Sequence, residues 1–306
     1  MNTFANRIFP ITTILVLLVI AAGSIVRSTQ SGMGCPDWPT CYGLIIPPTT
    51  ISQLPPDYQN IYANDGIPAE AFDATKTWIE YLNRLLGALL GLSVLLQTII
   101  SVRTRKENLI RFWASLVLLF LTGFQGWLGA MVVSSNLAPY RITIHMMVAF
   151  MILIIANIAT YSNRIVKVSD SRLYKFILLA MGMLFIQLVM GTQVREEIDV
   201  LAKSLNFSQR NIWIDNLSTL FPIHRSFSLL ILLINGYIVY TCKSRIDFWR
   251  KVKIPSMFLV AALMISVCSG IVMTYLSVPA MMQPVHLICA SLIIWSLHRL
   301  SLQFKA

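Results

Sequence analysis

Residues 78–102 read WIEYLNRLLGALLGLSVLLQTIISV, and Glu80 and Arg84 are the only charged side chains in this run. A helix of ~20 apolar residues is long enough to cross a lipid bilayer. Seven similar runs lie near 9–27, 111–134, 139–162, 173–195, 218–241, 255–277 and 281–303. The composition is 56% hydrophobic and only 12% charged, about half the charged fraction of a soluble domain. The sequence therefore predicts an all-α membrane protein with eight transmembrane helices.

The distribution of basic residues predicts which helix ends face the cytoplasm. If the N-terminus is inside, the inner segments hold 16 of the 24 Lys and Arg but only 3 of the 13 acidic residues, as the positive-inside rule requires. Contact with anionic lipid headgroups then explains the net charge of +11, and nucleic acid is dropped as a partner. Both termini are expected to be cytoplasmic.

The first apolar run has some features of a cleaved signal peptide, because Arg7 precedes it and small residues occupy 21–23. The run continues to Val26, however, and this length favours a retained first helix. No Arg- and Ser-rich transit segment precedes it. The expected location is therefore the bacterial cell (inner) membrane, crossed several times.

The sequence also repeats itself in two halves. An offset of 141 residues aligns Asn83-Arg84 with His224-Arg225, Gly129 with Gly270 and His145 with His286. In the first helix of each half, residues 23–27 match 191–195 at another offset. Four helices per half is an even number, so both halves cross in the same sense, and a pseudo-twofold axis along the membrane normal is expected. The predicted architecture is two four-helix bundles side by side, residues 1–165 and 166–306.

Three of the four histidines are predicted to lie at one depth, roughly 10 Å below the outer boundary at ~1.5 Å per residue. They are His145, His224 and His286, and Asn83 takes the same depth. A lone histidine in a span more often makes a hydrogen bond between helices, but three at one depth favour metal ligands. Two imidazoles on facing helices suit a heme iron, whereas zinc usually needs four ligands. His298 is interpreted as an interfacial residue.

Four arginines are predicted near the outer ends of helices, against the positive-inside trend, namely Arg27, Arg84, Arg195 and Arg225. Snorkelling to lipid phosphate explains any one of them. A set that is matched between the halves instead favours binding of anionic groups such as heme propionates. Arg27 and Arg84 would serve the first half, and Arg195 and Arg225 the second.

Glu80, Asn83 and Arg84 share one helical face, because they are spaced i, i+3 and i+4. The second half has no carboxylate aligned with Glu80. An acid near a helix N-terminus is also common as a residue that stabilises the helix dipole. The spacing alone leaves open whether Glu80 is such a residue or the acid of a functional site.

Cysteines indicate the compartment of the first outer loop, residues 28–77. Cys35 and Cys41 lie six residues apart in this loop, where an extracytoplasmic pair forms either a disulfide or a thiol–disulfide exchange site. Cys242, Cys268 and Cys289 lie in or beside predicted helices and are interpreted as packing residues. The loop is long enough to cover the outer mouth of the first bundle.

These motifs resemble the heme A synthase family. The resemblance is carried by residues 23–27, by SGMGCPDWP at 31–39 with Cys41, by Glu80-Tyr81-x-Asn83-Arg84 and by the three histidines. It implies an enzyme that oxidises a methyl group of heme O to the formyl group of heme A, by successive hydroxylations, for cytochrome c oxidase. It also implies a heme b cofactor between His224 and His286, substrate heme O bound through His145, and Glu80 as a catalytic, proton-handling group.

The family resemblance has further implications and two departures. It implies a heme O-producing farnesyltransferase and oxidase assembly factors as partners, and it links the Cys35–Cys41 pair to electron supply or loop stability. Self-association is left open. Asn83 stands where many members carry a second histidine, so the substrate iron is expected to be five-coordinate through His145. The second outer loop, 196–218, has no cysteines, whereas some relatives carry a second pair there.

Two other functions fit parts of the sequence. A bis-histidine b-type membrane cytochrome would transfer electrons without chemistry on the heme, but Glu80 and the unequal halves argue against it. A transporter with a parallel repeat would use the histidines and arginines to bind an anion. Its purified form would show no Soret band.

Overall fold

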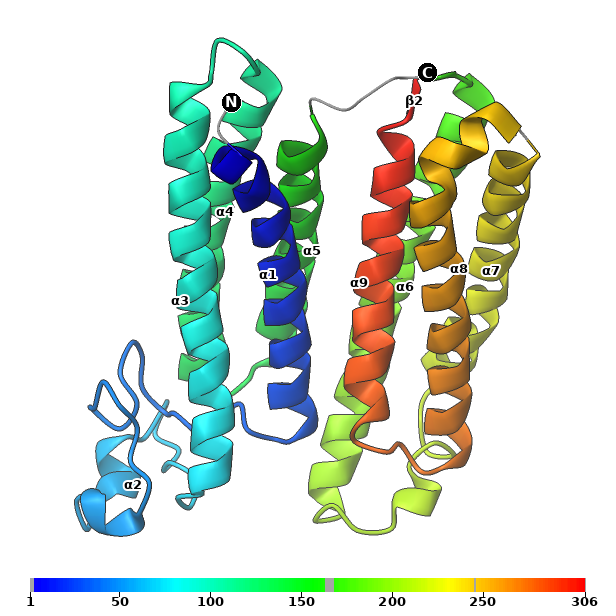
Figure 1. Ribbon diagram of the computed structural model, residues 1–306. Coiled ribbons are helices and arrows are strands. Elements are labelled where there is room, and N and C mark those ends of the chain that lie inside the picture. The colour runs from blue at the N-terminus through cyan, green and yellow to red at the C-terminus, as the bar shows by residue number, and fades with distance from the viewer. Residues whose placement is uncertain (1–2, 163–167, 245, 306) are drawn as a thin grey trace. The chain divides into compact units, whose positions relative to one another are not determined.

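Each of the eight predicted apolar runs lies in a long helix of the computed structural model, which describes residues 3–162, 168–244 and 246–305 (Figure 1). The chain divides into two compact units, Met1–Ser162 and Asn163–Ala306. The predicted boundary between residues 165 and 166 lies outside the described residues and stays a prediction.

The first unit is a ring of four long helices. These are α1 (Thr3–Ser28), α3 (Ala74–Arg103), α4 (Leu109–Ser134) and α5 (Pro139–Tyr161). Each helix packs against the next, and α5 returns to α1. The connection from α1 to α3 contains the short elements η1 (Ile51–Gln53) and α2 (Tyr58–Ile61). Because α3 and α5 are not neighbours in the ring, they stand opposite each other.

The second unit repeats this ring. Its helices are α6 (Ser171–Ser204), α7 (Leu220–Lys243), α8 (Ile246–Tyr275) and α9 (Met282–Ser301), with the short η2 (Arg210–Ile212) between α6 and α7. Contacts run α6–α7–α8–α9 and back to α6, so α7 and α9 stand opposite each other. A two-residue parallel pair, β1 (Val168–Ser169) with β2 (Phe304–Lys305), joins the two ends of this unit. No local pattern in the sequence predicts that pair.

Side-chain caps fix where several helices begin. The Asp73 carboxylate accepts the backbone N–H groups of Thr75 and Lys76 at the start of α3. Asn108 and Asp170 cap α4 and α6 in the same way. Such caps satisfy N–H groups that have no partner within the helix. The starts of α3, α4 and α6 fall within a few residues of the predicted runs.

Two helices extend well beyond their predicted spans. Helix α6 continues to Ser204, past the predicted end at 195, and α8 begins at Ile246 rather than 255. The extra turns are rich in charged residues, such as Glu196, Glu197 and Lys203 in α6. Hydropathy marks only the part of a helix that can face lipid, whereas the backbone hydrogen bonds of a helix continue into water.

Hydroxyl and amide side chains join the helices inside the first unit. Thr12 of α1 bonds Ser93 of α3 at 2.8 Å, and Thr13 bonds Thr160 of α5 at 2.9 Å. Gln97 of α3 donates to Ser115 of α4 at 3.3 Å. Lipid offers no competing partner, so such polar contacts specify which helices meet.

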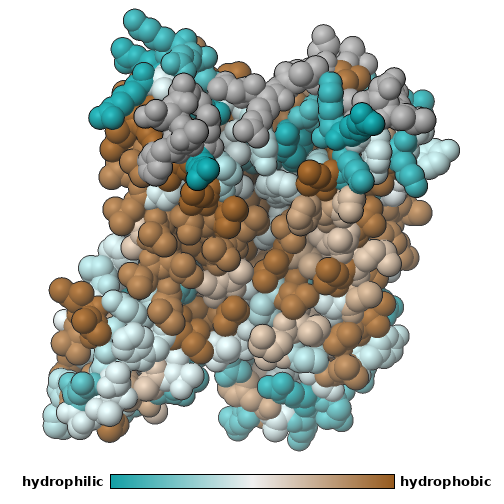
Figure 2. Space-filling view, in the orientation of Figure 1, coloured by the Kyte–Doolittle hydropathy of each residue, from teal (hydrophilic) through white to brown (hydrophobic). Residues whose placement is uncertain are grey.

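Seven of these helices are long and apolar enough to cross a membrane, and the chain is a multi-pass membrane protein. Large apolar side chains are exposed along them, for example Leu85, Leu89 and Leu92 of α3. Hydrophobic residues cover the middle of the helices and hydrophilic residues gather at their ends (Figure 2). The eighth helix, α9, is only 20 residues long and carries Gln283, two histidines and Arg299.

Candidate functional site

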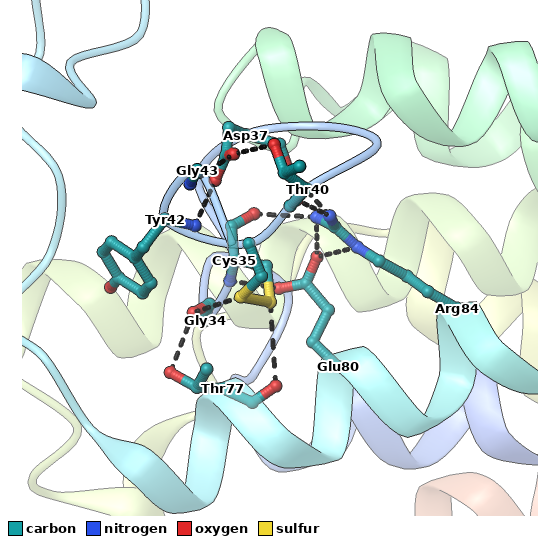
Figure 3. Close-up of a disulfide and its surroundings, with 10 residues drawn as sticks. Gly34, Cys35, Asp37, Thr40, Tyr42, Gly43, Thr77, Glu80 and Arg84 are labelled. Carbon is teal, nitrogen blue, oxygen red and sulfur yellow. Dashed lines mark hydrogen bonds and ion pairs between the residues drawn. A yellow bond between two sulfur atoms is a disulfide. The ribbon is translucent and has the colours of Figure 1, made fainter. Parts of the chain in front are cut away.

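The first-loop cysteines form a disulfide, Cys35–Cys41, and it is buried, with Cys35 0% and Cys41 1% exposed. Of the two sequence-based alternatives, the structure therefore has the bonded pair. Cys35 Sγ lies 3.7 Å from the Thr77 carbonyl oxygen of α3 (Figure 3). The disulfide is thus pressed against the first turns of α3 and shielded from solvent.

Gly34 explains how the loop comes so close to α3. A Cβ atom at this position would lie 2.6 Å from the carbonyl carbon and oxygen of Lys76. The Thr77 hydroxyl donates to the Gly34 carbonyl at 2.9 Å. Only glycine permits this approach of two backbones.

All of the N–H donors of Arg84 are used, and three of them bond the loop (Figure 3). A guanidinium has five N–H groups. Two of them donate to Glu80 Oε1, at 3.1 and 2.6 Å, and three donate to the carbonyl oxygens of Cys35 at 2.7 Å, Asp37 at 2.6 Å and Thr40 at 2.9 Å. The sequence suggested a heme propionate as the partner of Arg84. That role stays a prediction, and it would require one of these five bonds to be exchanged.

Glu80 lies beneath this loop and is only 4% exposed. Its Oε2 accepts the backbone N–H of Cys35 at 2.9 Å, while its Oε1 pairs with Arg84. The i, i+4 spacing noted in the sequence is thus a real ion pair. Glu80 is more than a dipole-stabilising residue, because it connects α3 to the disulfide.

Aromatic side chains cover the outer side of the loop. Tyr42 makes edge-to-face contacts with Tyr58, Tyr62 and Phe72, with ring centroids 5.4–6.0 Å apart. Burial, followed by the nearby Tyr58, Glu80 and Asp37, raises the pKa of Tyr42 to about 12. The phenol of Tyr42 therefore stays neutral at any physiological pH.

Each of the three histidines predicted at one depth rests on a glycine of the neighbouring helix. A Cβ atom at the glycine would lie 3.5 Å from the ring of His145 at Gly129, 3.2 Å from His224 at Gly191 and 3.8 Å from His286 at Gly270. Asn83, the fourth residue predicted at this depth, also lies beside a glycine. A Cβ at Gly23 would lie 3.9 Å from Asn83 Oδ1. The glycines that align in the sequence therefore have one role, which is to seat these side chains.

A polar residue four positions before each histidine-seating glycine also contacts the histidine. Gln125 donates to the backbone carbonyl of His145 at 2.9 Å, and Gln187 donates to that of His224 at 3.0 Å. In α8 the equivalent residue is Ser266, whose carbonyl lies 3.0 Å from His286 Nδ1. Sequence reasoning missed these residues, although their i, i+4 spacing to the glycine was available as a signal.

The ring nitrogens show which groups are available to a ligand. Within the described part of the chain, Nδ1 of His145 and Nδ1 of His224 are buried and find no hydrogen-bond partner. His286 Nδ1 is held by the Ser266 carbonyl and, at 3.0 Å, by the Ser269 hydroxyl. A hydrogen bond at one ring nitrogen orients the other toward a metal. His224 lies on α7 and His286 on α9, the two helices that stand opposite each other in the second ring.

This histidine arrangement suits an iron porphyrin better than a bare metal ion. No group of three or more His, Cys, Asp or Glu side chains that could hold a metal occurs among the residues that the structure describes. A heme needs only two protein ligands, because the porphyrin supplies the other four. Two opposed histidines in one bundle meet that requirement.

The other predicted arginines have varied surroundings. Arg195 forms an ion pair with Asp199 at 2.6 Å, and Arg27 lies in the last turn of α1. Arg225 stacks over Phe221 and lines a cavity of about 570 Å³ at the start of α7, together with Ser218, Thr219 and Thr274. Arg225 therefore borders a space that could admit an anionic group.

One minor interpretation from the sequence is wrong and another stays a prediction. His298 is buried inside the second unit, in the last turn of α9, and its interfacial depth stays a prediction. Cys268 is exposed on α8, whereas Cys242 and Cys289 are buried packing residues as expected.

Comparisons with known proteins show the family of this chain. Residues 6–298 match the COX15-CtaA family, described as cytochrome oxidase assembly protein. The chain belongs to this family. The heme A synthase of Shewanella oneidensis is 33% identical over 68% of this chain and 62% of its own length. The heme A synthases of Rickettsia prowazekii and Ehrlichia ruminantium are 24% and 25% identical, over 93% and 90% of this chain and 94% and 86% of their own lengths. The resemblance to heme A synthases is confirmed, and with it the involvement of heme.

The Arg84 contacts predict how the disulfide responds to a reductant. Arg84→Ala removes three bonds to the loop, and hydrogen bonds to charged groups contribute about 1.5–3 kcal/mol each. We expect the loop to open more often and the Cys35–Cys41 bond to be reduced about tenfold faster or more. The rate is measured by gel shift with a maleimide-polymer reagent.

Lys76→Ala is the control for this experiment, because Lys76 also lies on α3 but its ammonium only approaches Glu70 at 3.9 Å. It should react at the wild-type rate. Equal rates in Arg84→Ala and wild type would show that the arginine does not hold the loop closed.

The seating glycines predict unequal tolerance to alanine. In Gly191→Ala the new Cβ would lie 3.2 Å from His224, so the imidazole must shift, whereas in Gly270→Ala the distance of 3.8 Å to His286 is an ordinary contact. Overpacking costs about 1–3 kcal/mol. We expect Gly191→Ala to lose most of its bound heme and Gly270→Ala to keep it, as measured by the heme-to-protein ratio of the purified proteins. The reverse order would contradict the seating role.

Proposed function

We propose that this protein is a heme A synthase, a membrane oxidoreductase that converts a methyl group of heme O to the formyl group of heme A. Family membership supports the class of enzyme. The observation that carries the proposal is the pair of opposed histidines in the second unit, each seated on a glycine of an adjacent helix.

The second unit would hold the heme b cofactor. His224 and His286 would be its axial ligands, since each has a ring nitrogen left over from its protein contacts. Arg225 borders a cavity at the same end of the unit and is suited to bind a propionate. Arg195 is paired with Asp199, so its guanidinium would have to bind both this carboxylate and a propionate. Bound there, a low-spin heme b supplies electron transfer to the substrate site.

The first unit would bind heme O, the substrate. His145 would hold its iron, and Arg27 and Arg84 would be the basic groups at that end of the unit. Asn83 stands opposite His145, and its Oδ1 finds no donor among the described residues. An amide is a weak ligand for iron, so His145 alone would hold the substrate iron. The face beside Asn83 would then remain open to oxygen chemistry.

Glu80 would be the catalytic acid of the first unit. Buried carboxylates commonly hold or transfer protons in enzymes. The burial of Glu80 near the start of α3 supports such a role. Its partners Arg84 and Cys35 N–H fix the orientation of the carboxylate.

The finer points of topology also belong to this proposal. We infer that α9 is an eighth span, that the halves are related by a pseudo-twofold axis along the membrane normal, and that both termini face the cytoplasm of a bacterial cell. The basic loops support this orientation. A heme O-producing farnesyltransferase and oxidase assembly factors would be the partners in that membrane, and self-association stays open.

Spectra of single histidine variants test the cofactor site. Loss of either axial ligand should remove the low-spin heme b signal, so we expect this from His224→Ala and from His286→Ala. His145→Ala is the matched control, because it lies in the other unit and should keep the signal. An unchanged low-spin spectrum in both second-unit variants would exclude them as ligands.

Chromatography of extracted hemes tests the reaction. Co-expressed with a source of heme O, the wild type should yield heme A. Glu80→Gln keeps the size of the side chain but removes its charge and proton chemistry, so this variant should retain heme b and accumulate heme O. A wild-type yield of heme A would mean that Glu80 has only a structural role. Recovery of heme b alone from the wild type would favour an electron-transferring b-type cytochrome.

A further inference from the structure

The loop between α1 and α3 exposes a short run of large apolar residues, Leu44, Ile45 and Ile46. Ile45 is 83% and Ile46 is 68% exposed, and Leu44 is exposed as well. The surrounding stretch, residues 38–56, contains no charged side chain. A loop tip in water is normally polar, and consecutive exposed apolar residues indicate a binding surface.

The loop holds this apolar tip in a defined conformation. Leu44 is paired with Cys41 in an isolated bridge, with bonds of 2.9 and 3.1 Å. The Asp37 carboxylate accepts the N–H groups of Tyr42 and Gly43 in the turn just before the tip. Since Cys41 and Tyr42 are buried, the chain cannot turn Leu44–Ile46 inward without unfolding this turn.

The contacts of Arg84 show at which level of α3 the base of the tip lies. Arg84 is the eleventh residue of α3 (Ala74–Arg103) and bonds the carbonyls of Asp37 and Thr40. The same guanidinium bonds Glu80, the seventh residue of α3, so at ~1.5 Å per residue these loop carbonyls lie roughly 10 Å from the start of the helix. Leu82 and Leu85 lie at this level and are exposed. Hydrophobic side chains on the projecting loop stand at the level of the lower part of the hydrophobic band (Figure 2).

We propose that Leu44–Ile46 insert into the lipid leaflet at the α1–α3 end of the first unit and anchor the loop there. The occupant of this surface is the boundary between headgroups and acyl chains, which accepts apolar side chains without requiring hydrogen bonds. Trp38 is also exposed on this loop, and tryptophan favours that boundary. Leu44–Ile46 lie at the same depth as the exposed leucines of α3. Those leucines face lipid, because α3 is a membrane helix.

The anchor has a consequence for the disulfide. Arg84, Thr77 and Glu80 hold the inner side of the loop to α3, and lipid would hold the tip a few residues further along the chain. The Cys35–Cys41 bond lies between these two attachments. Lipid contact therefore adds to the shielding of the disulfide from water.

Spin labelling of the full-length protein in lipid nanodiscs tests the anchor. The probe is a nitroxide at Ile45→Cys in nanodiscs of phosphatidylethanolamine and phosphatidylglycerol, on a Cys268→Ser background because Cys268 is exposed. Asn60→Cys is the control, an exposed polar position of α2 in the same loop. Power-saturation measurements compare collisions with oxygen, which enriches in lipid, and with a water-soluble nickel chelate.

We expect oxygen collisions to dominate at position 45 and nickel collisions to dominate at position 60. Nickel accessibility at 45 equal to that at 60 would overturn the proposal, because the tip would then lie in water. Low accessibility of 45 to both reagents would also overturn it, since a protein surface would then cover the tip. Ile46→Cys provides a second reading, and resistance of the disulfide to reductant confirms that each labelled loop is folded.

Discussion

The ion pair between Arg84 and Glu80 is the interaction on which the geometry of the first loop rests. A buried charge is tolerated only when it is paired and hydrogen-bonded, and breaking such a pair costs about 3–5 kcal/mol. Here both partners of the pair also bond the loop. Glu80 accepts the Cys35 N–H, and Arg84 donates to three loop carbonyls. Charge therefore holds the loop to α3 beside the buried aromatic cluster around Tyr42. Leu44, Ile45 and Ile46 remain exposed.

A second constraint shapes the interior of each unit. A small residue beside each histidine ring lets the neighbouring helix approach, most tightly at Gly191, and a polar contact nearby fixes the register of the two helices. The pairs Gln125–Gly129, Gln187–Gly191 and Ser266–Gly270 provide both on one helical face. The same device in both units explains why the glycines align in the sequence while the polar residues before them do not need to match.

Much of this fold follows from local patterns. Long apolar runs specify the helices, because lipid permits little else to an unpaired backbone, and the internal repeat identified the histidines and their glycines. Three features depend on contacts between distant residues and carried no local signal. They are the three bonds of Arg84 to loop carbonyls, the backbone approach at Gly34 and the burial of His298. The ends of α6 and α8 were misplaced for a different reason, since hydropathy reports lipid contact and not the extent of the helix.

The inequality of the two units is informative under the proposed function. Gly23 approaches Asn83 as Gly191 approaches His224, so the seat is kept while the side chain differs. A cofactor must stay bound through many turnovers, and two imidazoles provide that. A substrate must leave as product, and a site with one imidazole binds it less tightly. Glu80 and the clamped disulfide loop occur in the unit with one imidazole, where the reacting group has to be positioned by contacts other than coordination. The amide at Asn83 is thus consistent with a substrate site and would be out of place in a permanent bis-histidine one.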